Sequence, residues 1–247
     1  QGGESETIIG NWLKLHPAKR DDMVLFTKVG LDMGIDAHRG LSKRWIMQAV
    51  EDSLRRLNTD YIDLYFAHWP DENTPHEETL AAFDLLKQQG KIRAYGSSNF
   101  NIDQLKSAMT AAESMAVAPY QVIQPEYNLY DRAGFENELR DLCTTHDLGV
   151  VSFYSLASGF LSGKYISLAD IQGSKRADTL AKYFDARGLR ILSTLKDIAE
   201  QHHAEPADVA LAWILAQPTI SAPIASATSV AQIESFAKAV ELQLTAD

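Results

Sequence analysis

The sequence has little of several residue types, and each shortage excludes a class of protein. One cysteine, Cys143, excludes an intrachain disulfide and a multi-cysteine zinc site; it falls in helical phase with Leu139 and Leu142, which favours core packing. Basic residues number 23 against 33 acidic ones and do not cluster, so we expect no nucleic-acid partner. No apolar run approaches the ~20 residues of a membrane span and no signal-peptide pattern opens the chain, so we expect no membrane partner and a cytoplasmic location.

Linkers and phosphate fingerprints are also missing. No stretch rich in proline, glycine and serine divides the 247 residues, a length within the range of one large α/β domain. We therefore expect residues 1–247 to form a single domain. No strand-like run is followed directly by GxGxxG, which argues against a doubly wound dinucleotide-binding sheet.

What the sequence does contain is a regular alternation of strand-like and helix-like segments. The strand-like runs are at residues 24–29, 61–67, 92–100, 122–128, 149–156 and 220–226. Helical patterns separate them, and a long loop is expected at about 157–186. Such alternation predicts parallel strands joined by right-handed crossovers. Six strands are two short of an eight-stranded barrel, so we expect a TIM (β/α)8 barrel whose first two strands are missing from this sequence.

Polar side chains stand where these strands end. Lys28 closes the first run, and the second ends in His68, Trp69 and Asp71. The later strand ends carry Ser98, Asn99, Gln124, Tyr154 and Ser155. Because the carboxyl ends of barrel strands form one mouth, we expect Lys28, His68, Ser98, Asn99, Gln124 and Tyr154 to converge there.

The ordered segments of the chain resemble the aldo-keto reductases from the first residue to about Ser235. They are GGESETIIG, VLFTKVG, YIDLYFAHWPD, GSSNF, QPEYN, VSFYSLASGFLSGKY and PIASATSVAQIES. The resemblance implies a TIM barrel and NADPH-dependent reduction of a small aldehyde or ketone. It also matches Lys28 and His68 to the family's catalytic lysine and histidine, whose Asp and Tyr partners would lie upstream of residue 1.

Carbonyl reduction requires these residue types. Hydride transfer leaves an alkoxide that an acid must protonate, and a tyrosine near pKa 10 is a poor acid at neutral pH. An ammonium ~4 Å away contributes about 4 kcal/mol at an effective dielectric of ~20, so Lys28 would tune the upstream tyrosine. A neutral His68 would donate an N–H to the carbonyl oxygen and orient it. The structural alternatives are a lysine at the barrel rim and a histidine hydrogen-bonded in the core.

The resemblance also implies a cofactor set in three parts. The nicotinamide carboxamide would be held by Ser98, Asn99 and Gln124, and its ring would stack on Tyr154. The pyrophosphate would be wrapped by Ser155, Leu156, Ser158, Gly159, Leu161 and Lys164. The adenosine end would contact Ser226, Thr228 and Gln232. The family's frequent basic residues are missing from the last group, where Ser229 and Gln232 also match a helix capping box. NADP is therefore expected from the family, and NAD is not excluded.

Two other functions compete with the reductase. One is a non-catalytic NADPH-binding regulatory subunit of the channel β-subunit type, whose GLS helix start resembles residues 40–42. An asparagine commonly replaces His68 in those subunits, so His68 favours the enzyme. A metal-dependent barrel hydrolase needs clustered carboxylates and histidines at strand ends, and only His68 is found.

The loop at 31–40, with Trp69 and Asp71, suggests a partly aromatic pocket wall. The identity of the substrate and the choice between monomer and homo-oligomer stay open.

Overall fold

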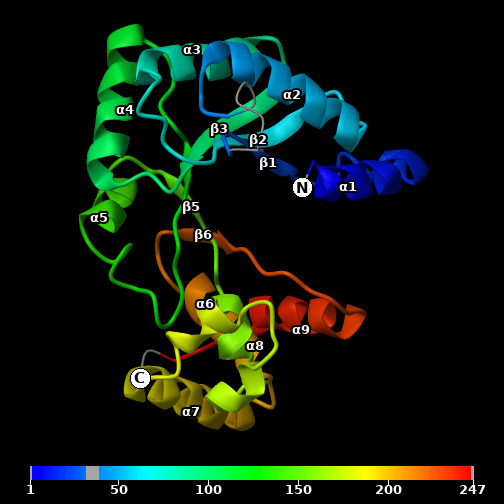
Figure 1. Ribbon diagram of the computed structural model, residues 1–247, viewed down its shortest axis with the longest axis vertical. Helices are drawn as coiled ribbons and strands as arrows, with labels where there is room; N and C mark the ends of the chain where they lie inside the picture. The colour runs from blue at the N-terminus through cyan, green and yellow to red at the C-terminus, as the bar shows by residue number, and fades with distance from the viewer. Residues whose placement is uncertain (1, 32–38, 246–247) are drawn as a thin grey trace. The chain divides into compact units, whose positions relative to one another are not determined.

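The computed structural model describes residues 2–31 and 39–245, which divide into two compact units between residues 123 and 124 (Figure 1). Within each unit the strands run parallel and follow one another in sequence order. Strands and helices alternate along the chain, and six strands are present. The predicted parallel α/β fold is thereby confirmed.

The strands are β1 (Phe26–Val29), β2 (Ile62–Ala67), β3 (Ile92–Ser98), β4 (Val122–Gln124), β5 (Gly149–Ser152) and β6 (Ile220–Pro223). The α-helices are α1 (Glu4–Leu15), α2 (Lys43–Leu57), α3 (His76–Gln88), α4 (Ile102–Met115), α5 (Glu138–Thr145), α6 (Ala177–Ala181), α7 (Ala186–Gln201), α8 (Pro206–Leu215) and α9 (Val230–Glu241). Short 3-10 helices occupy η1 (Pro17–Lys19), η2 (Ala157–Ser162) and η3 (Leu168–Ile171).

The sheet of the first unit is built on β2, which is buried at every position. Its apolar run therefore forms the fully covered strand that the sequence predicts. Thr27 pairs with Tyr65 on one side of β2, and Ala67 pairs with Ser97 on the other. A glycine is required in β3, because a Cβ on Gly96 would lie 2.4 Å from the carbonyl oxygen of Val122.

Three helices of the first unit, α2, α3 and α4, lie side by side next to this sheet (Figure 1). Ser42 caps α2 by accepting from the backbone N–H of Trp45, as the helix start at residue 42 predicts. The sequence predicts a capping box at the start of α3, with Thr74 and Glu77 at the required spacing and Pro75 at the first helical position. This prediction is wrong, because Pro75 precedes α3 without any side-chain cap and the Thr74 hydroxyl donates to Asp71 instead. Phe83 of α3 stacks on Tyr95 of β3, and both residues are buried in the core between the helix and the sheet.

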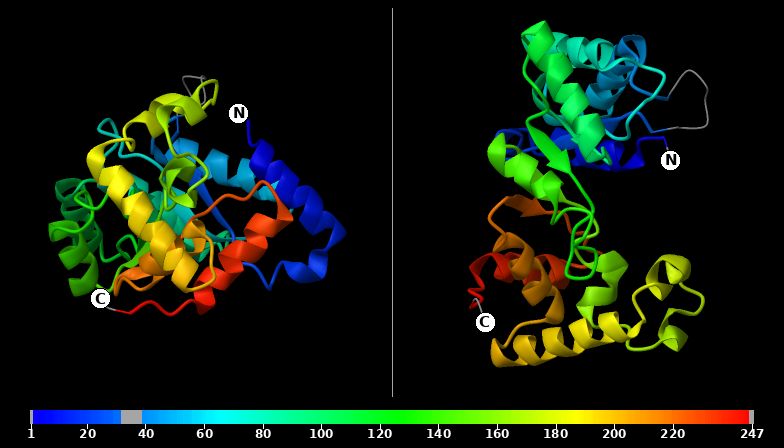
Figure 2. Two further views of the ribbon diagram at one scale, coloured as in Figure 1. Left: turned by 90° about the horizontal axis from the view of Figure 1, so that it is seen from below. Right: turned by 90° about the vertical axis from the view of Figure 1, so that its left-hand side faces the viewer.

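The second unit contains the β5–β6 pair and the adjacent helices α7 and α8 (Figure 2). The long loop expected at 157–186 is wrong in part, because η2, η3 and α6 lie within it. Ile171, Leu180 and Tyr183 anchor this segment in a buried cluster with Phe160. Its sequence has no extended helical period, so the pattern of the sequence does not predict these short helices.

Candidate active site

Two predicted catalytic residues lie at neighbouring strand ends in the first unit. Lys28 is the third residue of β1 and pairs with Phe66 of β2. His68 directly follows β2, and its backbone N–H donates to the Val29 carbonyl over 2.8 Å. Both side chains are half-buried. Hydrogen bonding between β1 and β2 therefore determines how close the ammonium and the imidazole are.

Their surroundings lower both pKa values. Burial lowers the pKa of Lys28 below its usual range. Burial also lowers the pKa of His68, and the positive charge of Lys28 lowers it further. Both causes penalise a second positive charge, so the imidazole is neutral at neutral pH. A neutral imidazole has one N–H to donate and one nitrogen that accepts.

Ser98 and Asn99 belong to the same cluster of strand ends. Ser98 is the buried last residue of β3, and Asn99 adopts a left-handed φ of 62°. The Asn99 side-chain amide donates to the His68 carbonyl over 2.9 Å and to the Ser98 hydroxyl over 3.2 Å. The first unit thus brings together four of the predicted site residues.

Two residues of the expected pocket wall flank this cluster. Trp69 is 49% exposed, and its ring is stacked near that of His68, with centroids 6.4 Å apart. The Asp71 carboxylate accepts from the backbone N–H of Leu41 over 2.8 Å, which ties it to the start of α2. Residues 32–38 of the expected wall lie outside the described residues.

In the second unit, Gln124 and Tyr154 lie at or just beyond strand ends. Gln124 is the buried last residue of β4. Tyr154 follows β5 after one intervening residue, is 48% exposed and has a φ of 53°, which is unusual for an aromatic residue. An exposed ring on a strained backbone is a conformation that the surrounding residues must hold in place.

The segment after Tyr154 forms a tight, left-handed turn. Ala157, Ser158 and Gly159 have φ values of 48°, 58° and 100°. Leu156 is half-buried and Leu161 is fully buried, so both pack inward. The buried Ser155 hydroxyl donates to the Ser152 carbonyl over 3.1 Å.

Two cationic side chains lie next to this turn. A Cβ on Gly159 would be 3.7 Å from the Lys164 amine, so the absence of a side chain leaves the ammonium next to open backbone. The Arg176 guanidinium donates to the Ser158 carbonyl over 3.3 Å. Successive left-handed residues with nearby cations suit a diphosphate. Arg176 is missing from the sequence prediction, because no local pattern connects it to Ser158, 18 positions away.

The residues assigned to the adenosine end lie around the start of α9, and all three are exposed: Ser226, Thr228 and Gln232. The side-chain oxygen of Gln232 accepts from the Thr228 backbone N–H over 2.7 Å. Ser229 caps α9 by accepting from the Gln232 N–H over 3.3 Å. The capping alternative therefore holds for Ser229, while the contacts of these residues with a cofactor stay a prediction.

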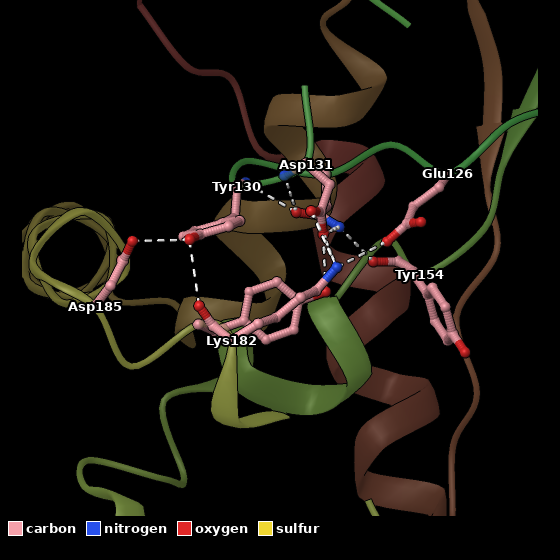
Figure 3. A network of polar contacts seen from close by, with 8 residues as sticks. Glu126, Tyr130, Asp131, Tyr154, Lys182 and Asp185 are labelled. Carbon is pink, nitrogen blue, oxygen red and sulfur yellow. Dashed lines mark hydrogen bonds and ion pairs between the residues drawn. The ribbon is translucent and has the colours of Figure 1, made fainter. Parts of the chain in front are cut away.

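A charged network beside Tyr154 is also missing from the sequence prediction (Figure 3). Lys182 lies 3.4 Å from Glu126 and 3.1 Å from Asp131. Burial and the charge of Asp131 raise the pKa of Glu126. Burial opposes ionisation of Asp131 as well, but hydrogen bonds from Tyr183, Asn128 and Lys182 outweigh it and lower its pKa. Asp131 therefore loses its proton at a lower pH than Glu126.

The described residues contain neither a metal-binding cluster nor a membrane-spanning helix. No group of three or more histidines, cysteines and carboxylates in residues 2–31 and 39–245 is placed to hold a metal ion. No helix in these same residues is both long enough and apolar enough to cross a membrane.

Comparison with known proteins assigns the family. The family model "Aldo/keto reductase family" matches residues 1–247. The chain is 36% identical to the uncharacterized oxidoreductase YrpG of Bacillus subtilis (strain 168), over 98% of this chain and 74% of that protein. It is 34% identical to the aldo-keto reductase YhdN of the same organism (96% and 70%) and to a probable voltage-gated potassium channel subunit beta of Arabidopsis thaliana (97% and 75%).

The chain belongs to the aldo/keto reductase family and is an oxidoreductase. Carbonyl reduction is the chemistry that this membership supports. Parallel strands that alternate with helices are consistent with the (β/α)8 barrel of the family. Where Lys28 and His68 lie relative to Gln124 and Tyr154 stays a prediction, as does the single domain.

Proposed function

We propose that this chain reduces small aldehydes or ketones to alcohols with NADPH, and that Lys28 and His68 act on the reacting oxygen. The observation that carries the proposal is the half-buried pair at the ends of β1 and β2. The pair holds one positive charge on Lys28 and one neutral N–H donor on His68. A carbonyl that becomes an alkoxide needs both.

The two residues have different tasks. The ammonium of Lys28 stabilises negative charge and would thereby lower the pKa of the catalytic tyrosine that the family resemblance implies, the acid that protonates the alkoxide oxygen. At ~4 Å and an effective dielectric of ~20 this effect is about 4 kcal/mol, or roughly three pKa units. His68 donates its N–H to the carbonyl oxygen and fixes its position. Asn99 holds the backbone of His68 in place through the 2.9 Å bond to its carbonyl.

The described residues fit a nicotinamide dinucleotide. When bound, the cofactor supplies the hydride. The exposed ring of Tyr154 offers a stacking face, and the turn at Ser158 and Gly159 with Lys164 and Arg176 offers a cradle for the diphosphate. Ser98, Asn99 and Gln124 offer amide and hydroxyl groups that match a carboxamide. Ser226, Thr228 and Gln232 would face the adenosine end, and the preference for NADPH over NADH rests on the family alone.

The test is NADPH oxidation by the purified full-length protein with 4-nitrobenzaldehyde, an activated aldehyde, followed at 340 nm with NADH in parallel. We expect turnover with NADPH and no turnover without the aldehyde. Absence of turnover across a broad panel of carbonyl compounds, together with tight NADPH binding, would contradict the reductase.

That negative outcome would favour a regulatory subunit, a function that the name of the Arabidopsis relative suggests. Substitution of His68 by asparagine distinguishes the two. If the chain is a reductase, His68→Asn lowers kcat and leaves the Kd of NADPH within about threefold, because the imidazole contacts substrate and not the cofactor phosphates.

A further inference from the structure

Tyr154 has a backbone that an aromatic residue rarely adopts, and the contacts of its carbonyl show what holds it. Its φ is 53°, a left-handed conformation that is strained for any residue other than glycine. The Tyr154 carbonyl accepts from the Ala157 N–H over 2.7 Å and from the Asn128 side-chain amide over 3.1 Å. Only the second bond comes from outside the turn itself.

Asn128 is fully buried and uses its whole hydrogen-bonding capacity. Its amide nitrogen donates one hydrogen to the Tyr154 carbonyl and one to Asp131, over 3.1 Å each. Its amide oxygen accepts from the backbone N–H groups of Tyr130 and Asp131 over 2.8 and 2.9 Å. An asparagine with all of these bonds made has one orientation, because a flipped amide would lose every one of them.

Asp131 fixes the orientation of Asn128, because its carboxylate accepts one of the two hydrogens of the Asn128 amide. Its carboxylate accepts from Asn128, from the Tyr183 hydroxyl over 2.8 Å and from Lys182 over 3.1 Å. Lys182 also reaches Glu126, the second residue after β4. The chain of contacts therefore runs from a charged cluster, through one amide, to the backbone of the exposed aromatic residue.

We propose that Asn128 and Asp131 are positioning residues for the nicotinamide, which they control by holding the Tyr154 ring in its stacking orientation. This inference rests on the proposed function, in which Tyr154 stacks on that ring. Neither residue touches the cofactor. The link is the hydrogen bond from the Asn128 side-chain amide to the Tyr154 carbonyl. Its loss frees the aromatic side chain without altering the diphosphate cradle or the adenosine end.

The experiment measures two halves of the cofactor separately by calorimetry on the full chain. Reduced nicotinamide mononucleotide probes the Tyr154 end, and adenosine 2',5'-bisphosphate probes the other. Asn128→Asp retains the acceptor oxygen and removes both donated hydrogens, and Asp131→Asn removes the charge that orients Asn128. We expect each variant to weaken the nicotinamide half about tenfold, the factor for one lost hydrogen bond of ordinary strength, and to leave the other half unchanged.

Glu136→Gln is the matched control. Glu136 also accepts from a buried tyrosine hydroxyl, that of Tyr127, and from a cation, Arg132 over 2.9 Å, but it has no bond to Asn128 or Tyr154. Its substitution removes a carboxylate of the same kind in the same unit, and both Kd values should stay at the wild-type level. Circular dichroism establishes that every variant is folded.

Two further results separate this inference from the proposed function. If Tyr154→Ala leaves the Kd of the nicotinamide half unchanged, stacking by Tyr154 is wrong, and the proposed cofactor site fails with it. If Tyr154→Ala weakens that half while folded Asn128→Asp and Asp131→Asn do not, only the positioning inference is overturned. Equal weakening of both halves would also overturn it, since that is the signature of a general structural role.

Discussion

At the scale of single residues, a lysine and a histidine at adjacent strand ends cannot both hold a proton without repulsion. The lysine retains its proton because its reference pKa of ~10.4 is far above the ~6.5 of histidine. Burial and the charge of Lys28 then make His68 the neutral partner. Lys28 therefore supplies a positive charge and His68 a neutral hydrogen-bond donor, because two half-buried groups on neighbouring strands cannot both be charged at low cost.

Lys28→Met should lower kcat/KM by a factor on the order of 10²–10³, because it removes the charge that tunes the acid and that charge is worth about 4 kcal/mol at most. The Kd of NADPH should stay within about threefold of wild type. Steady-state kinetics and fluorescence titration check both values. Lys14→Met, at an exposed position of α1, is the control. A parallel fall of affinity and activity would show that Lys28 serves binding instead.

The same substitution should raise the pKa of His68, since the charge of Lys28 is one of the causes that lower it. NMR titration of the imidazole protons measures the shift, with His68→Gln identifying the resonance. In the wild type the unfolded chain binds this proton more readily than the folded one. Stability is therefore lost as the pH falls below ~6.5 toward the lower folded value. A His68 pKa unchanged by Lys28→Met would contradict the proposed coupling.

At the scale of elements, α1 packs on α2 through a glycine. A Cβ on the buried Gly10 would lie 1.9 Å from the Arg56 carbonyl oxygen. Helix propensity alone would favour alanine by about 1 kcal/mol, but overpacking against backbone costs ~1–3 kcal/mol and must separate the helices. We expect Gly10→Ala to reduce the free energy of unfolding by about 1 kcal/mol, the overpacking cost less the gain in helix propensity, measured by urea denaturation.

Gly134→Ala serves as the control for this prediction. A Cβ on Gly134 meets no atom within 4 Å, so the substitution should change the unfolding free energy by less than about 0.5 kcal/mol. An unchanged or raised stability of Gly10→Ala would show that α1 does not pack on α2 as described.

Helix starts show how far local sequence can predict an element. Asn101 and Gln104 form the complete capping box of α4, because each side chain reaches a backbone N–H within one turn. The pattern at Thr74 is similar, yet Asp71 takes the threonine hydroxyl away. A local pattern therefore holds where no neighbour competes for the same polar group. The cap at Thr74 was decided by a contact that the pattern does not contain.

At the scale of the whole molecule, periodicity sufficed to predict six strands, their parallel direction and the polar residues at their ends. It could not identify Arg176 or the pair Asp131 and Lys182. Arg176 bonds to Ser158, 18 positions away, and Lys182 bonds to Asp131, 51 positions away. Arg176 and Lys182 lie in a segment whose structure depends on burial of isolated apolar side chains. Contacts of that kind carry no local pattern, whereas each strand end carries its own.

The expectation of one domain over residues 1–247 leads to the last prediction. If all strands belong to one cooperative structure, residues 1–123 and 124–247 unfold together. Tryptophans allow each part to be followed by itself: Trp12, Trp45 and Trp69 belong to the first and Trp213 to the second. Trp213→Phe reports on the first part, and the triple replacement of the other three by phenylalanine reports on the second.

The urea midpoint of each variant is first measured by circular dichroism and compared with that of the wild type, which gives the effect of the tryptophan substitutions on stability. After correction for that effect, the fluorescence transitions of the two variants should have the same midpoint. Trp213 is a sensitive probe of its part, because its ring lies 5.5 Å from that of Tyr127 and 5.1 Å from the guanidinium of Arg132. A folded intermediate that retains only one fluorescence signal would contradict the single domain. It would mean that residues 1–123 and 124–247 fold separately.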